Sequence, residues 1–283
     1  MPREIKKNVY LLKAADWNRR LFDSLIPLPD GTSYNAYLVA GSEKTALLDT
    51  VDPSMEGVLM RQLAGVKRID YLVSQHAEQD HSGSIPAVLG RYADAVVVCT
   101  PKAKQMLVDH LDLRPERIRT VEDGESISLG DKTLRFLHTP WVHWPETMST
   151  YLPEDRILFS CDFFGSHLAT SDLYAGDDPR VADAAKRYYA EIMMPFRAAI
   201  RADMKKVRVR AEDAGLVAEA EPDHHPDGGD EEQQQPRPRR DGERGAGRTT
   251  THPRRPSLRS RSRPAWSGSR SAPAPASCRA ARG

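Results

Sequence analysis

The residues between positions 76 and 81 carry a dense set of side chains that bind metals. The segment reads HAEQDH and holds two histidines, a glutamate and an aspartate in six positions. Imidazole and carboxylate groups on one short loop can converge on two cations, whereas a single metal would not need four ligands from so short a segment. A charged, solvated loop would be the plainer interpretation for a lone histidine, but it explains four such residues poorly. We therefore predict a two-metal site built on His76, Glu78, Asp80 and His81.

The surrounding pattern places this segment at the end of a strand. The preceding IDYLVS is typical of a strand, and the following SGSIPAVLGRY of a loop that leads into a helix. Between residues 8 and 165, short β-type runs alternate with turns, and helix-length stretches lie at 54–63, 85–92 and 102–111. A longer helical repeat covers residues 180 to about 207 and should pack on the strands. This pattern predicts an α/β sandwich of two sheets with helices outside.

Composition limits the remaining function classes. The 283 residues hold 41 basic and 40 acidic side chains, and three cysteines, Cys99, Cys161 and Cys278, form no CxxC pair. Neither a disulfide framework nor a cysteine-based zinc site is indicated. No apolar run is long enough to cross a bilayer, and the first residues lack a hydrophobic signal segment. We expect a cytoplasmic chain with no membrane partner.

The chain changes character in its last quarter. Residues 222–283 contain 13 Arg, 7 acidic residues and nine Pro but no Lys, so this stretch is net basic and the rest net acidic. Such text cannot bury enough apolar surface to offset its chain entropy, and we predict a disordered tail over residues 208–283. A basic tail for nucleic acid is one interpretation. Out-of-frame translation of a GC-rich gene is the one we favour, so no nucleic-acid partner is expected.

The pattern HxExDH resembles the first metal motif of the flavodiiron proteins, also called A-type flavoproteins or rubredoxin:oxygen oxidoreductases. They are a branch of the metallo-β-lactamase superfamily, whose hydrolases carry HxHxDH. Glu78 stands where those hydrolases have their middle histidine, and a hard oxygen ligand suits iron better than zinc. The resemblance continues with His143 in TPWVHWPETM and with Asp162, nineteen positions later, in LFSCDFFG. Similar text covers roughly residues 5 to 206, including DWNRRLF, GTSYNAYLV, LLDTVDP and YYAEIMMPF.

The resemblance implies a fold and a ligand set. The fold would be a metallo-β-lactamase-like αββα sandwich. One iron would be held by His76, Glu78 and His143, the other by Asp80 and His81, with Asp162 bridging them. The family's seventh ligand is a histidine in a Pro-Ser-His-Gly turn, and its candidate here is His224, 62 positions after Asp162 in text that lacks this turn.

The resemblance also implies an activity. Flavodiiron proteins are oxidoreductases that reduce O2 to water or NO to N2O at two Fe ions, with FMN on a C-terminal flavodoxin-like domain. They are homodimers and take electrons from donors such as rubredoxin or a reduced flavoprotein. Here we expect an incomplete metal domain over residues 1–207, the tail over 208–283, and no flavodoxin-like domain. Two alternatives stay open. One is an FMN-free di-iron oxygen sensor. The other is a zinc-dependent hydrolase, which the glutamate at position 78, in place of a histidine, makes a poorer match.

Four neighbouring residues receive plainer interpretations. His138 is expected to be structural, and His167 has no assigned role. Cys161 is expected to pack as a small apolar residue, because successive residues of an extended chain face opposite sides and Asp162 faces the metals. We predict no pocket role for Asp23.

Overall fold

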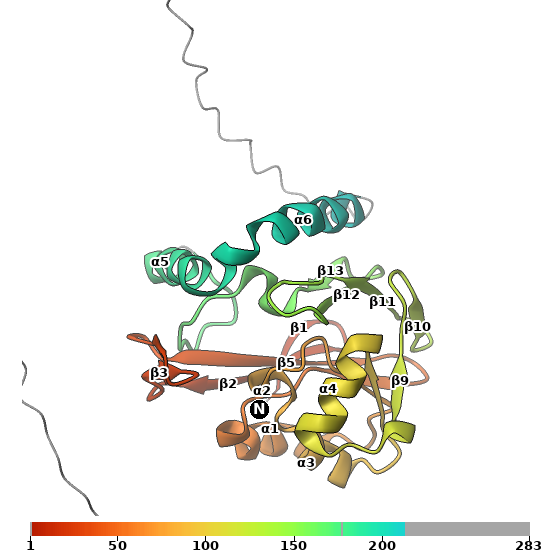
Figure 1. The fold of residues 1–283 in the computed structure, drawn as a ribbon. Helices are drawn as coiled ribbons and strands as arrows, with labels where there is room; N and C mark the ends of the chain where they lie inside the picture. The colour runs from red at the N-terminus through yellow and green to blue at the C-terminus, as the bar shows by residue number, and fades with distance from the viewer. Residues whose placement is uncertain (1, 177, 213–283) are drawn as a thin grey trace, which may run out of the picture. The chain divides into compact units, whose positions relative to one another are not determined.

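Two β-sheets form the centre of the chain in a computed structural model, which describes residues 2–176 and 178–212 (Figure 1). The larger sheet has the strand order β1-β2-β5-β6-β7-β8-β9, and the smaller one β10-β11-β12-β13. Strands β6 to β9 run parallel, and the other pairings of both sheets are antiparallel. The strands of the large sheet are β1 (Arg3–Lys6), β2 (Val9–Asp16), β5 (Thr32–Ala40), β6 (Thr45–Leu48), β7 (Tyr71–Val73), β8 (Val96–Cys99) and β9 (Ile118–Thr120). Those of the small sheet are β10 (Ser126–Ser128), β11 (Thr133–His138), β12 (Met148–Leu152) and β13 (Ile157–Phe159).

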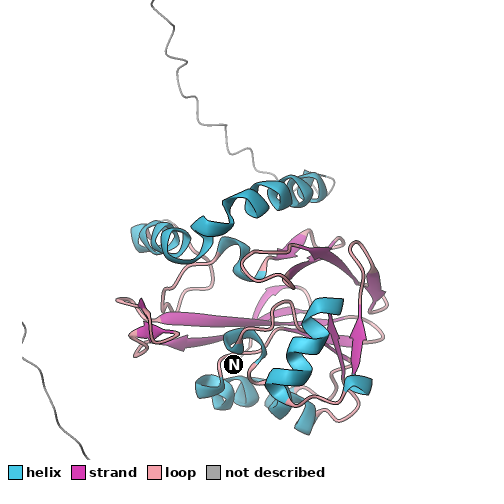
Figure 2. Ribbon diagram, viewed as in Figure 1, coloured by secondary structure: helices cyan, strands magenta, loops and turns pink. Residues whose placement is uncertain are grey.

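Helices cover the outer faces of both sheets (Figure 2). A short hairpin of β3 (Leu21–Phe22) and β4 (Ile26–Pro27) projects beside the large sheet. The helices next to the large sheet are η1 (Pro53–Met55), α1 (Glu56–Gln62), η2 (Leu63–Gly65), α2 (Gln79–Ser82), α3 (Ile85–Arg91), α4 (Pro101–Leu111) and η3 (Pro115–Arg117). Those beyond the small sheet are η4 (Cys161–Phe164), α5 (Pro179–Tyr188), η5 (Tyr189–Met193), η6 (Met194–Phe196) and α6 (Arg197–Glu212). The predicted αββα sandwich is therefore confirmed.

Two apolar layers hold the sandwich together. One lies between the large sheet and its helices and includes Leu47, Leu72 and Leu107. The other lies between the two sheets and includes Val73 and Phe136. Neighbouring residues of one strand, such as Leu72 and Val73, belong to different layers, because successive side chains of a strand point to opposite faces. Both faces of the large sheet's central strands are buried, which explains why the sequences of these strands are almost entirely apolar.

Local signals start helix α4 directly after strand β8. The side chain of Thr100 accepts a hydrogen bond from the backbone N–H of Ala103, which caps the helix, and Pro101 occupies its first position. Both features favour a helix start. Asp112 ends the helix in a left-handed conformation. The predicted helix over 102–111 is found with its start one residue earlier.

The single long helix predicted for residues 180–207 is wrong in one respect, because it is broken. Helix α5 ends at Tyr188, the π-helical turn η5 and the tight turn η6 follow, and α6 then begins at Arg197. Pro195 explains the break, since proline lacks an N–H and its ring clashes with the carbonyl four residues earlier. Helix α6 continues to Glu212, beyond the expected domain end at Val207. Residues 208–212 of the predicted tail are therefore helical, and the rest of the tail, including His224, lies outside the described residues. None of the described helices combines the length and hydropathy that a membrane span requires.

Candidate metal centre

The predicted ligands come together where the ends of both sheets meet. The parallel strands β6 and β7 end at neighbouring points, so Asp49, which follows β6, lies beside the loop that carries His76. From the small sheet, His143 lies in the loop between β11 and β12, and Asp162 follows β13. A backbone hydrogen bond of 2.9 Å from the Met148 N–H to the Gln75 carbonyl ties the two sheets together at this place.

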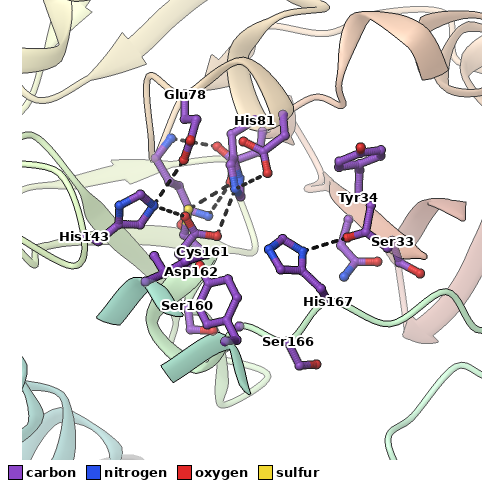
Figure 3. A pocket seen from close by; sticks show the side chains of 18 of the residues that line it. Ser33, Tyr34, Glu78, His81, His143, Ser160, Cys161, Asp162, Ser166 and His167 are labelled. Carbon is purple, nitrogen blue, oxygen red and sulfur yellow. Dashed lines mark hydrogen bonds and ion pairs between the residues drawn. The ribbon is translucent and has the colours of Figure 1, made fainter. Parts of the chain in front are cut away.

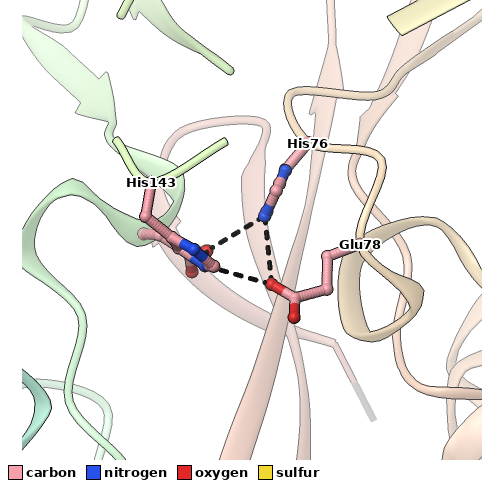
Figure 4. Close-up of side chains that lie close together, drawn as sticks. His76, Glu78 and His143 are labelled. Atoms are coloured by element: carbon pink, nitrogen blue, oxygen red, sulfur yellow. Dashed lines mark hydrogen bonds and ion pairs between the residues drawn. The ribbon is translucent and has the colours of Figure 1, made fainter. Parts of the chain in front are cut away.

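Four side chains converge on one point (Figure 4). One ligand atom from each of His76, Glu78, His143 and Asp162 lies within 4.8 Å of the other three. The Nε2 atoms of His76 and His143 are both 3.1 Å from Oε2 of Glu78. Both are also 3.5 Å from Oδ2 of Asp162. This arrangement of two imidazoles and two carboxylates suits a divalent metal.

The other oxygen of Asp162 faces a second group. Its Oδ1 atom lies 3.0 Å from Nε2 of His81, and Oδ2 of Asp80 lies 3.5 Å from the same nitrogen. The remaining oxygen of Asp80, Oδ1, is buried without a hydrogen-bond partner among the described residues. Asp162 thus presents one oxygen to each ligand group, as a bridging carboxylate does.

Two buried acids support the histidines from behind. Oε1 of Glu146 lies 2.7 Å from Nδ1 of His76. Oδ2 of Asp49 lies 3.5 Å from Nδ1 of His81, and Asp49 also accepts hydrogen bonds from the backbone and the side chain of Gln75. Such contacts fix the ring orientation and leave Nε2 to face the ligand groups. Neither acid was expected from the sequence, although Asp49 directly follows strand β6 and Glu146 follows His143 by three residues.

The charges of the centre shift its pKa values strongly. Burial alone would lower the pKa of His76, but hydrogen bonds to Glu146 and Glu78 raise it to about 9. Burial would also lower the pKa of His143, but hydrogen bonds to Asp162 and Glu78 raise it to about 9. Burial would raise the pKa of Glu78, but His143 and His76 lower it to about 2. Burial raises the pKa of Asp80 to about 7. Positive charge is therefore favoured at this point, as a bound metal ion would supply.

The interpretation of Cys161 as a packing residue that faces away from Asp162 is wrong. Its Sγ atom lies 3.5 Å from Nδ1 of His81, and Asp49, His81 and Cys161 form a second group with metal-binding spacing. The chain is not extended here: Cys161 has a φ of +53° and begins the tight turn η4. The alternation that holds in a strand is lost, and both Cys161 and Asp162 line the same cavity.

The cavity beside the ligands has a volume of about 140 Å3 and is shown in Figure 3. Rings of Tyr37 and Tyr188 line it together with the ligands. His167, for which no role was predicted, also lines this cavity, and Ser33 adds a polar part to its wall. A space of this size holds a few water molecules or a small substrate such as a diatomic gas.

The other two residues singled out in the sequence lie outside this cavity. His138 is not placed to bind a metal, because its Nε2 atom donates a hydrogen bond of 3.0 Å to the Val121 carbonyl. Asp23 does not line this cavity but lines a neighbouring one together with Glu78, and its carboxylate accepts a hydrogen bond of 3.4 Å from Gln79. Burial and the nearby Glu78 raise the pKa of Asp23.

Known proteins resemble this chain in sequence and in fold. The family model described as "ODP family beta lactamase" matches residues 32–217. A nitric oxide reductase of Moorella thermoacetica is 40% identical over 201 residues, which cover 69% of this chain and 50% of the relative. The solved rubredoxin oxygen:oxidoreductase from Desulfovibrio gigas matches with a TM-score of 0.71 and 32% identity, over 76% of this chain and 54% of that one. The flavodiiron protein from Giardia intestinalis matches with a TM-score of 0.69 and 32% identity, over 76% and 52%.

The fold and the convergent ligands define a metal-binding domain of the metallo-β-lactamase type. The family model matches more than half of the chain, which is sufficient to assign the chain to that family. The chain belongs to the ODP family of beta lactamases and, within it, to the flavodiiron proteins. It spans about half the length of the relatives it matches.

Proposed function

We propose that residues 1–207 form the di-iron domain of an enzyme that reduces O2 to water, NO to N2O, or both. The observation that carries this proposal is the position of Asp162, whose two oxygens face two separate groups of ligands. The names of the relatives support both substrates, since one is a nitric oxide reductase and another an oxygen oxidoreductase.

Each ligand has a role in this proposal. His76, Glu78 and His143 hold one iron, Asp80 and His81 hold the other, and Asp162 bridges them. The family pattern assigns a further ligand of the second iron to His224. Three carboxylates lower the net charge of the pair, which helps the site to hold both Fe(II) and Fe(III).

An iron pair supplies electrons and open coordination positions to a small oxidised substrate. The chain's own part is to hold the ligands rigidly and to keep the reaction away from bulk water. Glu146 and Asp49 orient His76 and His81 from behind. The buried rings of Phe22 and Tyr188 limit the cavity to small molecules.

The electron supply extends the proposal beyond this domain. By analogy with the relatives, we infer a donor such as rubredoxin or a reduced flavoprotein, an FMN cofactor in the complete system, and a homodimer. The absence of membrane-spanning helices among the described residues is compatible with the cytoplasmic location that we propose.

Gas consumption by the iron-loaded chain tests this function. The chain is loaded with Fe(II) without oxygen, given a reduced flavoprotein, and followed by O2 and NO electrodes. We expect consumption of at least one gas, its loss in H143A, and its retention in H110Q, which alters an exposed histidine on α4. Reversible O2 uptake without turnover would instead favour the sensor. A chain that takes zinc in preference to iron and cleaves thioesters or phosphodiesters would be a hydrolase.

A further inference from the structure

His167 carries a ring nitrogen that the ligand groups do not use. Its Nε2 atom is buried and has no hydrogen-bond partner among the described residues. The residue lines the same cavity as His81 and Asp162, and Figure 3 shows its ring on the wall that faces them. A buried polar group without a partner costs about 1–3 kcal/mol, so its retention at a functional cavity calls for an explanation.

The other ring nitrogen of His167 is already paired. Nδ1 lies 3.1 Å from Oγ1 of Thr32, a residue that is 3% exposed. No other acceptor of the Thr32 hydroxyl is found among the described residues, so its hydrogen is best placed on this contact. Nδ1 then accepts, and the ring proton must reside on Nε2. The Nε2 atom is therefore a donor toward the cavity.

The ring is held in place and is uncharged. The ring centroids of Phe22 and Tyr188 lie 4.9 Å and 5.1 Å from that of His167. Burial lowers the pKa of His167 to about 4, against the opposing effect of nearby carboxylates. A neutral imidazole with a fixed orientation is a pre-organised hydrogen-bond donor.

His167 also stands back from the ligands. It belongs to neither of the two groups with metal-binding spacing, one around His76 and the other around His81. The ring therefore lines the cavity beside the ligands without belonging to either group.

We propose that His167 donates a hydrogen bond from Nε2 to the diatomic substrate in the cavity, with Thr32 fixing the tautomer. The inference rests on the proposed function and adds to it a residue that touches substrate. It gives the cavity a directional contact for the oxygen end of O2 or NO, where negative charge develops on reduction.

The tautomer can be tested without metal or turnover. Nitrogen-15 NMR of the metal-free chain distinguishes a protonated Nε2 from a protonated Nδ1. We expect His167 to carry its proton on Nε2 in the wild type and to become a mixture of tautomers in T32V. A wild-type ring protonated on Nδ1 would overturn the proposal, because Nε2 could then only accept.

The contact itself is tested with NO as the probe of the reduced, iron-loaded chain. In H167L we expect the N–O stretching frequency to rise and NO to dissociate roughly tenfold to a hundredfold faster, as for the loss of one hydrogen bond of about 1.5–3 kcal/mol. H167Q, whose amide can still donate, should recover part of both effects, and H110Q should resemble the wild type.

Iron content separates the two possible failures. If H167L binds as much iron as the wild type but its NO frequency and dissociation rate are unchanged, the role of His167 is wrong and the proposed function stands. If the wild type itself binds no iron, the proposed function fails, and the role of His167 fails with it. Unchanged circular dichroism and melting temperature show that each variant is folded.

Discussion

Nδ1 of His76 lies 2.7 Å from Oε1 of Glu146, and the side chains of both residues are inaccessible to solvent. The two residues are 70 positions apart and lie in loops that follow strands of different sheets. Glu146 is held in turn, because its backbone carbonyl accepts a hydrogen bond of 2.8 Å from the Thr100 hydroxyl. The histidine that is deepest in the candidate metal centre is therefore oriented by a carboxylate that is itself fixed to the end of β8.

Loss of this carboxylate should weaken metal binding without removing a ligand. For E146Q we expect the affinity for Fe(II) or Zn(II) to fall roughly tenfold to a hundredfold, because His76 loses the partner that orients it. Competition with a chromophoric chelator measures this affinity. E116Q, which alters an exposed glutamate, is the matched control. Equal affinities in E146Q and E116Q would contradict the role of Glu146.

Metal removal should lower the stability of the domain. A metal that binds only the folded chain stabilises it by about 2.7 kcal/mol at a free concentration of one hundred times Kd. We expect the melting temperature to rise on metal addition, to return on chelation, and to respond less in E78Q, which loses a ligand of one iron. Differential scanning calorimetry with and without chelator measures the effect, and a melting curve indifferent to metal would count against a folded-state site.

Asp203 on α6 should make stability depend on pH. It is 7% exposed, and burial raises its pKa to about 6. Because the folded chain holds this proton more tightly than the unfolded chain, the stability contribution of Asp203 is lost as pH rises from about 4 to about 6. D203N avoids burying the charge and should be more stable by about 1–3 kcal/mol at pH 7.5.

Urea unfolding of the metal-free chain at pH 4.5 and pH 7.5 provides the comparison. The advantage of D203N should shrink at the lower pH, where the aspartate is protonated in the native state. D183N, at an exposed position on α5, should show little of this pattern. An advantage that is the same at both pH values would mean that the charge of Asp203 is not its cause.

The layer between the two sheets should dominate the stability of the domain. Phe136 on β11 is fully buried in this layer. F136A is expected to lower the free energy of unfolding by about 3–5 kcal/mol, through lost apolar burial and the cavity left behind. Denaturant unfolding compares it with F164A, whose ring is 60% exposed in the native chain and should cost much less. Similar losses in the two variants would contradict the packing described for the sheets.

Much of the fold and of the site could be predicted because the signals are local. The segment HAEQDH follows an apolar strand as expected, but only its first three residues form a loop, because Gln79–Ser82 form the short helix α2. His143 and Asp162 lie in segments that follow strands of the other sheet, and their proximity to His76 follows from the sequence only through the family resemblance. The structure then brings all three together.

The remaining features depend on backbone geometry and on long-range pairing. Glu146 and Asp49 could not be recognised, because their partners are defined only once the strand ends have met. The orientation of Cys161 was predicted wrongly because its left-handed backbone breaks strand alternation. The helix break at Pro195 could have been anticipated from the proline itself.

The most direct test of the central claim is the number and coupling of iron ions in the chain. Native mass spectrometry and Mössbauer spectroscopy of the anaerobically loaded protein measure both. The account predicts two iron ions per chain that are magnetically coupled through the shared carboxylate of Asp162, and loss of this coupling in D162N. A wild-type chain that binds a single iron, or two uncoupled ones, would contradict it.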